Sequence, residues 1–141
     1  MSCVLRVSGA DFAVDTFLAD SSLKAVAVFR RGQPKSPAAN PKGPKLNASG
    51  FHAVVSEADF SKLHIQIADA VQFLEQNHTD LSRLKAFLGV DGISLDFGIE
   101  ERDVAAQSER FPPKLLSLLG DLGIWLEFTL YPVAEANHSE R

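Results

Sequence analysis

Two stretches of this sequence decide the fold: residues 93–99 read ISLDFGI, and residues 124–130 read IWLEFTL. In each stretch an apolar residue stands at every second position. This alternation is the pattern of a β-strand that buries one face against other elements and leaves the opposite face more polar. We therefore predict two strands, each with one row of side chains beneath helices; the rows are Ile93, Leu95, Phe97 and Ile99, and Ile124, Leu126, Phe128 and Leu130.

The segment between these two strands predicts a polar loop over residues 101–110 and then a helix. Pro112 and Pro113 suit the first turn of a helix, because the N–H groups of that turn need no partner within the helix. Gly123 ends the helix before the last strand begins. Its predicted buried stripe is Leu115, Leu116, Leu119 and Leu122.

Two further helices are predicted upstream of residue 93. Ser56 is the predicted cap of the principal helix, in which apolar residues recur at spacings of three and four. Its buried stripe is Phe60, Leu63, Ile67, Ala70, Val71 and Leu74, and its exposed face is Lys62, Gln66, Asp69 and Glu75. Thr79 is the predicted cap of a short second helix with Leu81, Leu84 and Leu88 inside, and Gly89 is its predicted left-handed C-terminal residue.

The N-terminal part predicts a strand over residues 3–8, a short helix over about 10–19 and strands over 25–30 and 51–56. Ser8, with Asp11 three residues later, is the predicted cap of the short helix. Residues 32–50 contain four prolines among Gly, Asn, Ser and Lys, so no continuous strand or helix fits them. We expect them to form a long exposed loop, which is uncommon in small domains and is usually functional or disordered.

The predicted order is β-α-β-β-α-α-β-α-β, which defines an α+β protein. We expect a mixed or antiparallel sheet of about five strands with helices packed on one face. The order is that of the split β-α-β arrangement of ferredoxin-like folds, extended by one helix and one strand. Residues 1–133 are expected to form a single domain, followed by a polar tail over 134–141.

Composition sets limits on the setting of the protein. The chain has 141 residues, a net charge of −4 and a single cysteine, Cys3, so no intrachain disulfide can form. It has no signal-peptide pattern and no apolar run near the ~20 residues of a membrane helix. These features predict a cytoplasmic protein that is not a membrane protein. The acidic balance argues against general nucleic-acid binding, although an average can hide a local patch.

One segment is strongly basic against this acidic background. Residues 21–56 contain six Lys and Arg residues and no acid, a charge of +6 that leaves −10 for the rest. Arg30 and Arg31 can make planar bidentate pairs with an anion, and Lys35, Lys42 and Lys45 can act as point charges. The alternative is a solvated loop whose lysines keep an exposed hairpin soluble and unpaired.

Two aromatic residues of the last strand, Trp125 and Tyr131, are predicted on the face opposite the Leu126 row. If no element covers that face, they form an exposed patch that suits a protein partner, a second copy of the chain or stacked bases. The alternative is that the long loop or a helix folds over them.

No motif assigns a catalytic or metal site, and no cofactor is predicted. Asp96 and Glu100 share one strand face about 13 Å apart, too far to bind one metal ion unaided, so a hydrated strand face is expected. The four histidines lack zinc spacing. Cys3 is expected inside a strand, where a thiol behaves as a small apolar group.

Four motifs occur together in a fixed order: CVLRVSGADF at 3–12, FRRG at 29–32, GFHAVVSEADF at 50–60 and FPPKLLSLLGDLGIWLEFTLY at 111–131. Together they resemble a family of small bacterial domains of about this length that carry no assigned function. That family has a basic-Gly turn and a final helix ending in Leu-Gly before an alternating strand with a terminal Tyr. It usually has Trp where Phe51 stands. The resemblance implies an α+β fold and no catalytic residue.

Two functional hypotheses follow. The first is a non-catalytic binding module that engages a protein partner, or its own copy as a homo-oligomer, through the Trp125 and Tyr131 face or the basic loop. The second is a protein that binds a small anion or nucleotide beside Arg30 and Arg31, a class that includes enzymes. Nucleic-acid binding through the loop is a weaker third hypothesis, because the acidic body opposes it.

Overall fold

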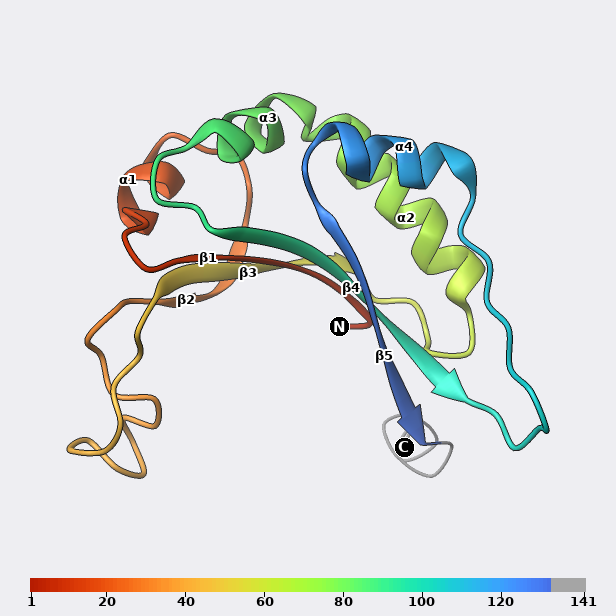
Figure 1. Cartoon of the computed structure of the whole chain (residues 1–141), viewed down its shortest axis with the longest axis horizontal. Coiled ribbons are helices and arrows are strands. Elements are labelled where there is room, and N and C mark those ends of the chain that lie inside the picture. The colour runs from red at the N-terminus through yellow and green to blue at the C-terminus, as the bar shows by residue number, and fades with distance from the viewer. Residues whose placement is uncertain (133–141) are drawn as a thin grey trace.

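The computed structural model describes residues 1–132; the predicted polar tail at 134–141 lies outside the described residues. The helices and strands follow the predicted order (Figure 1). They are β1 (Cys3–Gly9), α1 (Val14–Ala19), β2 (Ala25–Phe29), β3 (Ser49–Ser56), α2 (Leu63–Gln76), α3 (His78–Ala86), β4 (Gly92–Glu101), α4 (Pro113–Asp121) and β5 (Trp125–Pro132). The prediction of an α+β protein with this element order is confirmed.

The five strands form one mixed sheet in the order β2-β3-β1-β4-β5. The first four strands in this order pair antiparallel with one another, as in a ferredoxin-like sheet. β5 lies parallel to β4, which the α4 crossover makes possible. The helices lie on one side of the sheet, and the β2–β3 and β4–α4 connections extend beyond its other side like the legs of an arch (Figure 1).

The core lies between the helices and the helix-facing side of the sheet. β1 is central and has neighbours on both sides, so Cys3, Leu5 and Val7 are fully buried, as predicted. A cluster of phenylalanines closes the α1 end of the core, where the Phe17 ring stacks on Phe51 at 6.0 Å. Each buried large apolar side chain contributes about 1.5–3 kcal/mol relative to an exposed one.

The predicted start of α1 is wrong. The helix begins at Val14 rather than near residue 10, and Ser8 does not cap it. Ser8 is instead part of β1, which continues to Gly9 and pairs with both β3 and β4. The turn after β1 is held from outside, because Asp91 Oδ2 accepts the Ala10 N–H at 2.9 Å.

The start and one face of α2 also differ from the prediction. The helix begins at Leu63, and Ser56 is not its cap; the Ser56 hydroxyl accepts the Ala58 N–H and donates to Asp69. Gln66, predicted on the exposed face, is fully buried. Its Nε2 donates to the Gly98 carbonyl at 2.8 Å, which satisfies the amide nitrogen inside the core. Its Oε1 has no hydrogen-bond partner among the described residues.

Two leucines predicted on the buried sides of helices are exposed. Leu88 follows α3 and is almost fully exposed, because the chain turns at Phe87 and the ring of that residue takes the inner position. Leu116 of α4 is also exposed, although Leu115, Leu119 and Leu122 are buried as predicted. The helix end at Gly123, with φ of +67°, is confirmed.

The turn after β1 and the turn after α3 touch through two glycines. A Cβ on Gly9 would lie 2.8 Å from the carbonyl carbon of Gly89. A Cβ on Gly89 would lie 2.7 Å from the carbonyl carbon of Asp11, and Gly89 has φ of +93°. The Asp91 N–H donates to the Ser8 carbonyl at 2.9 Å across this joint. Neither glycine has room for a side chain.

The two alternating segments differ in burial. The β4 row is buried throughout, as predicted: Ile93, Leu95, Phe97 and Ile99. In the last segment Ile124 is buried and Leu126 is half-buried, but Phe128 is 54% exposed and Leu130 is 48% exposed. The prediction that both rows lie beneath helices is therefore wrong for the outer half of β5. The reason is topological, because β5 is an edge strand and the helices cover the inner strands.

The long connection between β2 and β3 forms an exposed arm. Its base is a short ladder, in which Gly32 N–H donates to Leu46 O at 2.9 Å and Lys35 N–H to Pro44 O at 2.9 Å. The prolines interrupt this ladder, so no regular strand extends over 32–48. Over residues 1–132, no helix is long and apolar enough to cross a membrane.

Candidate interaction surface along strand β5

Within the described sheet, β5 has a strand neighbour on one side only. Its eight residues pair with β4 from Ser94↔Trp125 to Glu101↔Pro132. In the described part of the chain, no backbone hydrogen bond joins β5 to any element other than β4. The N–H and C=O groups of alternate β5 residues therefore point away from the sheet and have no backbone partner among residues 1–132, as in any uncovered edge strand.

Apolar side chains flank the C-terminal half of this edge. Phe128 and Leu130 line one side of a hollow of about 310 Å³, and the loop after β4 lines the other with Val104 and Ala105. Phe111 lies between the hollow and the core; its ring centroid is 6.5 Å from that of Phe128 and 5.4 Å from that of Phe97. The hollow is thus an outward extension of the core.

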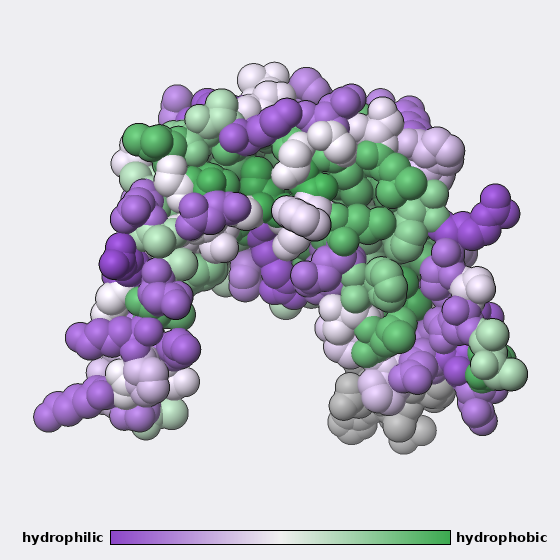
Figure 2. All heavy atoms as spheres, in the orientation of Figure 1, coloured by the Kyte–Doolittle hydropathy of each residue, from purple (hydrophilic) through white to green (hydrophobic). Residues whose placement is uncertain are grey.

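A second hollow, of about 320 Å³, flanks the N-terminal half of β5. It is lined by Gly120 and Gly123 at the end of α4 and by Trp125 and Leu126 of the strand. The Trp125 side chain is 75% exposed. Figure 2 shows apolar side chains gathered from α4 down along β5 on the side that faces the viewer. The two hollows and the strand edge make one surface, which we call the β5 surface.

The two edges of the sheet differ in their protection. β2 has five residues and a register shift between Ala25 and Ala27, and it lies between Lys24 and the Arg30–Arg31 pair. Bulges, short strands and basic residues are the devices by which proteins prevent pairing at sheet edges. β5 is longer and pairs with β4 in continuous register, and its one charged residue is Glu127. The unprotected edge is therefore β5.

A polar network on the open face of the sheet holds β5 in place. Asp96 is 6% exposed; Arg6 of β1 donates to it at 3.2 Å, and the Thr129 hydroxyl of β5 donates to it at 2.9 Å. The prediction of a hydrated strand face is therefore wrong at Asp96. The carboxylate tolerates burial because it receives hydrogen bonds from both neighbouring strands.

Trp125 and Tyr131 do not form a joint patch. The Tyr131 ring stacks on Phe60 at 4.5 Å with an interplanar angle of 18°. Phe60 belongs to the segment before α2 and covers Gly98, where a Cβ would lie 2.6 Å from the ring. The alternative of a covered aromatic residue therefore holds for Tyr131, which packs against Phe60. The alternative of an exposed aromatic residue holds for Trp125.

Trp125 also borders a hollow of about 280 Å³ on the open face, with Arg6, His52 and Phe29. Burial lowers the pKa of His52, and the positive charge of Arg6 lowers it further. The ring of Phe29 meets the His52 ring at 5.6 Å. Because Asp96 already balances the charge of Arg6, the described residues of this hollow supply no free cation that favours an anionic ligand.

The structure gives the predicted basic residues local partners. Arg30 donates to both carboxylate oxygens of Asp15, at 2.8 and 2.7 Å, and Arg31 donates to Asp11 at 3.2 Å. The hydrogen bond from Arg30 lowers the pKa of Asp15, and the same contact raises the pKa of Arg30. Both arginines therefore fasten the base of the arm to the α1 segment. Lys35, Lys42 and Lys45 lie exposed along the arm.

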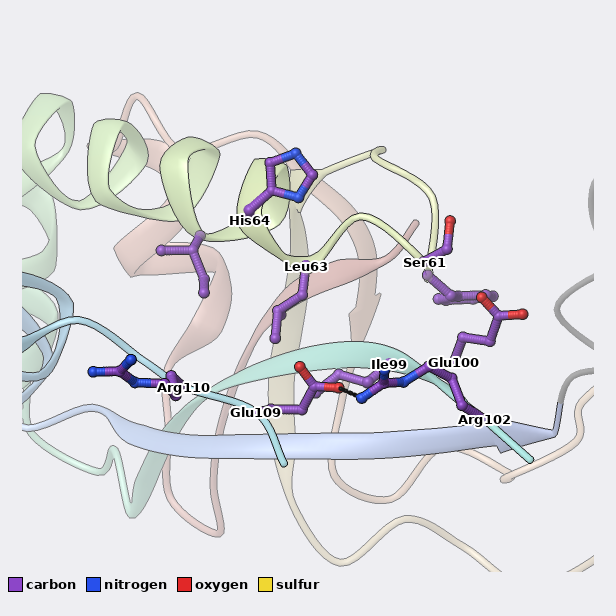
Figure 3. Close-up of a pocket in the computed structure, with 10 residues that line it drawn as sticks. Ser61, Leu63, His64, Ile99, Glu100, Arg102, Glu109 and Arg110 are labelled. Atoms are coloured by element: carbon purple, nitrogen blue, oxygen red, sulfur yellow. Dashed lines mark ion pairs between the residues drawn. The ribbon is translucent and has the colours of Figure 1, made fainter. Parts of the chain in front are cut away.

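A further hollow, of about 370 Å³, lies between the start of α2 and the end of β4 (Figure 3). Its ion pair joins Arg102 to Glu109 at 3.7 Å. Figure 3 shows the His64 ring directed away from Leu63 and Ile99, and Arg110 directed away from that ion pair. The polar side chains do not converge on one point, so the residues described here form no arrangement of acid, base and nucleophile.

Two other kinds of reactive site, a metal-binding cluster and a reactive cysteine, are also absent from the described residues. In residues 1–132, no three His, Cys, Asp or Glu side chains gather closely enough to hold a metal ion. Cys3 is buried, and burial, followed by the charges of Asp96 and Asp69, raises the pKa of its thiol far above the ordinary value. Such a thiol stays protonated and is a poor nucleophile.

Comparison of the chain with protein-family models, with curated proteins and with solved structures finds no match. The resemblance to a family of small bacterial domains therefore stays a prediction, and the surfaces described above carry the functional argument.

Proposed function

We propose that this protein is a non-catalytic interaction module that binds a polypeptide along the edge of β5. The observation that carries the proposal is the eight-residue edge strand, uncovered by residues 1–132, with a partly apolar hollow beside each half. An extended segment that pairs with such an edge gains main-chain hydrogen bonds, and its alternate side chains enter the flanking hollows. The partner is therefore a protein, as the first sequence hypothesis states, although through a different surface from the one expected.

The apolar part of the binding energy comes from side chains that are half-covered in the isolated chain. Full burial of a large apolar side chain is worth about 1.5–3 kcal/mol, so covering the exposed half of Phe128 or Leu130 contributes about 1 kcal/mol each. Covering Trp125 contributes more, because three quarters of its surface is exposed.

The alternative function, binding of a small anion or nucleotide beside Arg30 and Arg31, has less support. An anion there has to displace the carboxylates of Asp15 and Asp11, which already pair with the two guanidinium groups. Both ion pairs lie at the exposed surface, where water and salt weaken any added anion contact. The proposal retains the cytoplasmic setting and the bacterial origin expected from the sequence.

Affinity capture with three forms of the immobilised chain tests the proposal. The forms are the wild type, Phe128→Lys on the β5 edge and Val26→Lys on the β2 edge, where Val26 is 57% exposed. We expect the wild type and the β2 control to retain the same polypeptide, whether another protein or an untagged copy of the chain. The β5 variant should lose it, because a lysine on an edge strand opposes pairing. Equal retention by all three forms, or retention of nothing, would overturn the proposal.

A further inference from the structure

The β5 surface has the properties of a self-complementary interface. Two copies of one edge strand can pair antiparallel about a two-fold axis perpendicular to the sheet, and each residue then faces its symmetry counterpart. If the axis passes through Phe128, residues 125–131 all find a partner. Trp125 then faces Tyr131 of the second copy, Leu126 faces Leu130, and Phe128 faces itself.

This register also places the only charge of β5 favourably. Glu127 faces Thr129 of the second copy, so no two carboxylates lie opposite each other. A shift of the axis by one residue to Glu127 brings two carboxylates face to face, which destabilises a strand pair. The charge of Glu127 therefore disfavours that shifted register, whereas the register about Phe128 sets apolar residues opposite apolar residues and Glu127 opposite a hydroxyl.

The same axis relates the two flanks of β5. The loop with exposed Val104 lies beside Leu130, and the open hollow lined by Gly120 and Gly123 lies beside Leu126. Because the two-fold axis sets Leu130 opposite Leu126, the Val104 loop of one copy faces the glycine-lined hollow of the other.

We infer that the partner of the β5 surface is a second copy of this chain, paired antiparallel about Phe128 in a continuous ten-stranded sheet, twice the five strands of one copy. This inference rests on the proposed function, because it names the polypeptide that the β5 edge binds. A stable interface covers about 800 Å² on each partner. One chain exposes 8553 Å² in all, so an interface of that size takes up only a small part of its surface.

Sedimentation and light scattering of the full chain test the oligomeric state. The wild type and Val26→Lys should show twice the mass of one 15.3 kDa chain at micromolar concentration. Phe128→Lys should show a single chain, because the axis brings the two new charges together. Circular dichroism of each variant verifies that it is folded, and a dimer that survives Phe128→Lys overturns the inference.

Disulfide formation tests the register independently of that variant. Opposite residues of an antiparallel pair have Cα atoms about 4.5–5.5 Å apart, within the range that a disulfide spans. Phe128→Cys should therefore form a covalent dimer on mild oxidation. Leu126→Cys should not, because its two copies would lie about 13 Å apart along the strands. The native Cys3 is buried and does not compete.

Failure of the inference can be told apart from failure of the proposed function. A monomeric wild type that still captures another protein in a Phe128-dependent way overturns the two-copy inference and leaves strand addition in place. A monomeric wild type that captures nothing overturns both. Cross-linking through Leu126→Cys but not through Phe128→Cys overturns the register and with it the inference.

Discussion

Replacement of Asp96 by alanine should destabilise the protein by about 2–3 kcal/mol, because it removes the acceptor that joins β1, β4 and β5. The largest loss is the hydrogen bond from the Thr129 hydroxyl at 2.9 Å. Hydrogen bonds to charged groups contribute about 1.5–3 kcal/mol. The ion pair with Arg6 adds only about 0.5 kcal/mol, as is usual for pairs that water reaches. Here the Arg6 side chain is 40% exposed, so water can replace the carboxylate.

Thermal and urea unfolding measure this effect. At about 3 °C per kcal/mol for a chain of this size, the melting temperature should fall by roughly 6–9 °C. Glu127→Ala is the matched control, since Glu127 is an exposed carboxylate that lies beside Asp96 on the same face of the sheet. Its change in stability should stay within about 0.5 kcal/mol.

A double-mutant cycle isolates the contact itself. Thr129→Val removes the donor, and the combined Asp96→Ala and Thr129→Val variant should be less destabilised than the sum of the two single variants, by about 1 kcal/mol. Strict additivity would mean that the hydroxyl and the carboxylate are not coupled. An increase in stability on removal of Asp96 would refute the reasoning. It would show that the desolvation penalty of the buried carboxylate exceeds the stabilisation from its hydrogen bonds and ion pair.

Two further predictions concern titration. Hydrogen bonds from the Ser22 hydroxyl and N–H lower the pKa of Asp80 below its ordinary value of 3.8. The stability that this contact contributes is therefore complete above pH 3.8. It is lost as the pH falls through the lower pKa of the folded state. In urea unfolding at about pH 5 and pH 2.5, the stability advantage of the wild type over Asp80→Asn should shrink at the lower pH, and a constant advantage would contradict this. The Cys3 thiol, buried and with a raised pKa, should react with an aromatic disulfide reagent on the order of 100-fold or more slowly in the folded than in the urea-unfolded chain, and equal rates would show that the site opens freely.

Local patterns predicted the elements of this fold because most of them report directly on burial. The alternation in residues 93–99 gave the correct strand and inner row, since β4 has strands on both sides and helices above it. The same alternation in residues 124–130 gave the strand but not its exposure. Strand order decides which strand is an edge, and strand order depends on pairings between distant segments that periodicity does not encode.

The polar residues were harder to place for a related reason. Gln66 and Asp96 both stand at positions where a polar side chain suggests solvent, yet each is buried with partners on other strands or loops. Arg30 looked free to bind a ligand, but its partner Asp15 lies on the preceding helix, beyond the reach of any local pattern. The β5 surface was therefore missed as a whole, and exposed Trp125 was its only predicted member.

The contact between Gly9 and Gly89 has a consequence for how this chain can diverge. A mutation at either position has to move a main-chain segment rather than a side chain, so no compensating change nearby restores the fit. Related sequences should keep both glycines, or lose both together with this backbone contact. This should hold even where their surface residues have diverged completely. The pair is accordingly a fingerprint by which distant relatives can be aligned.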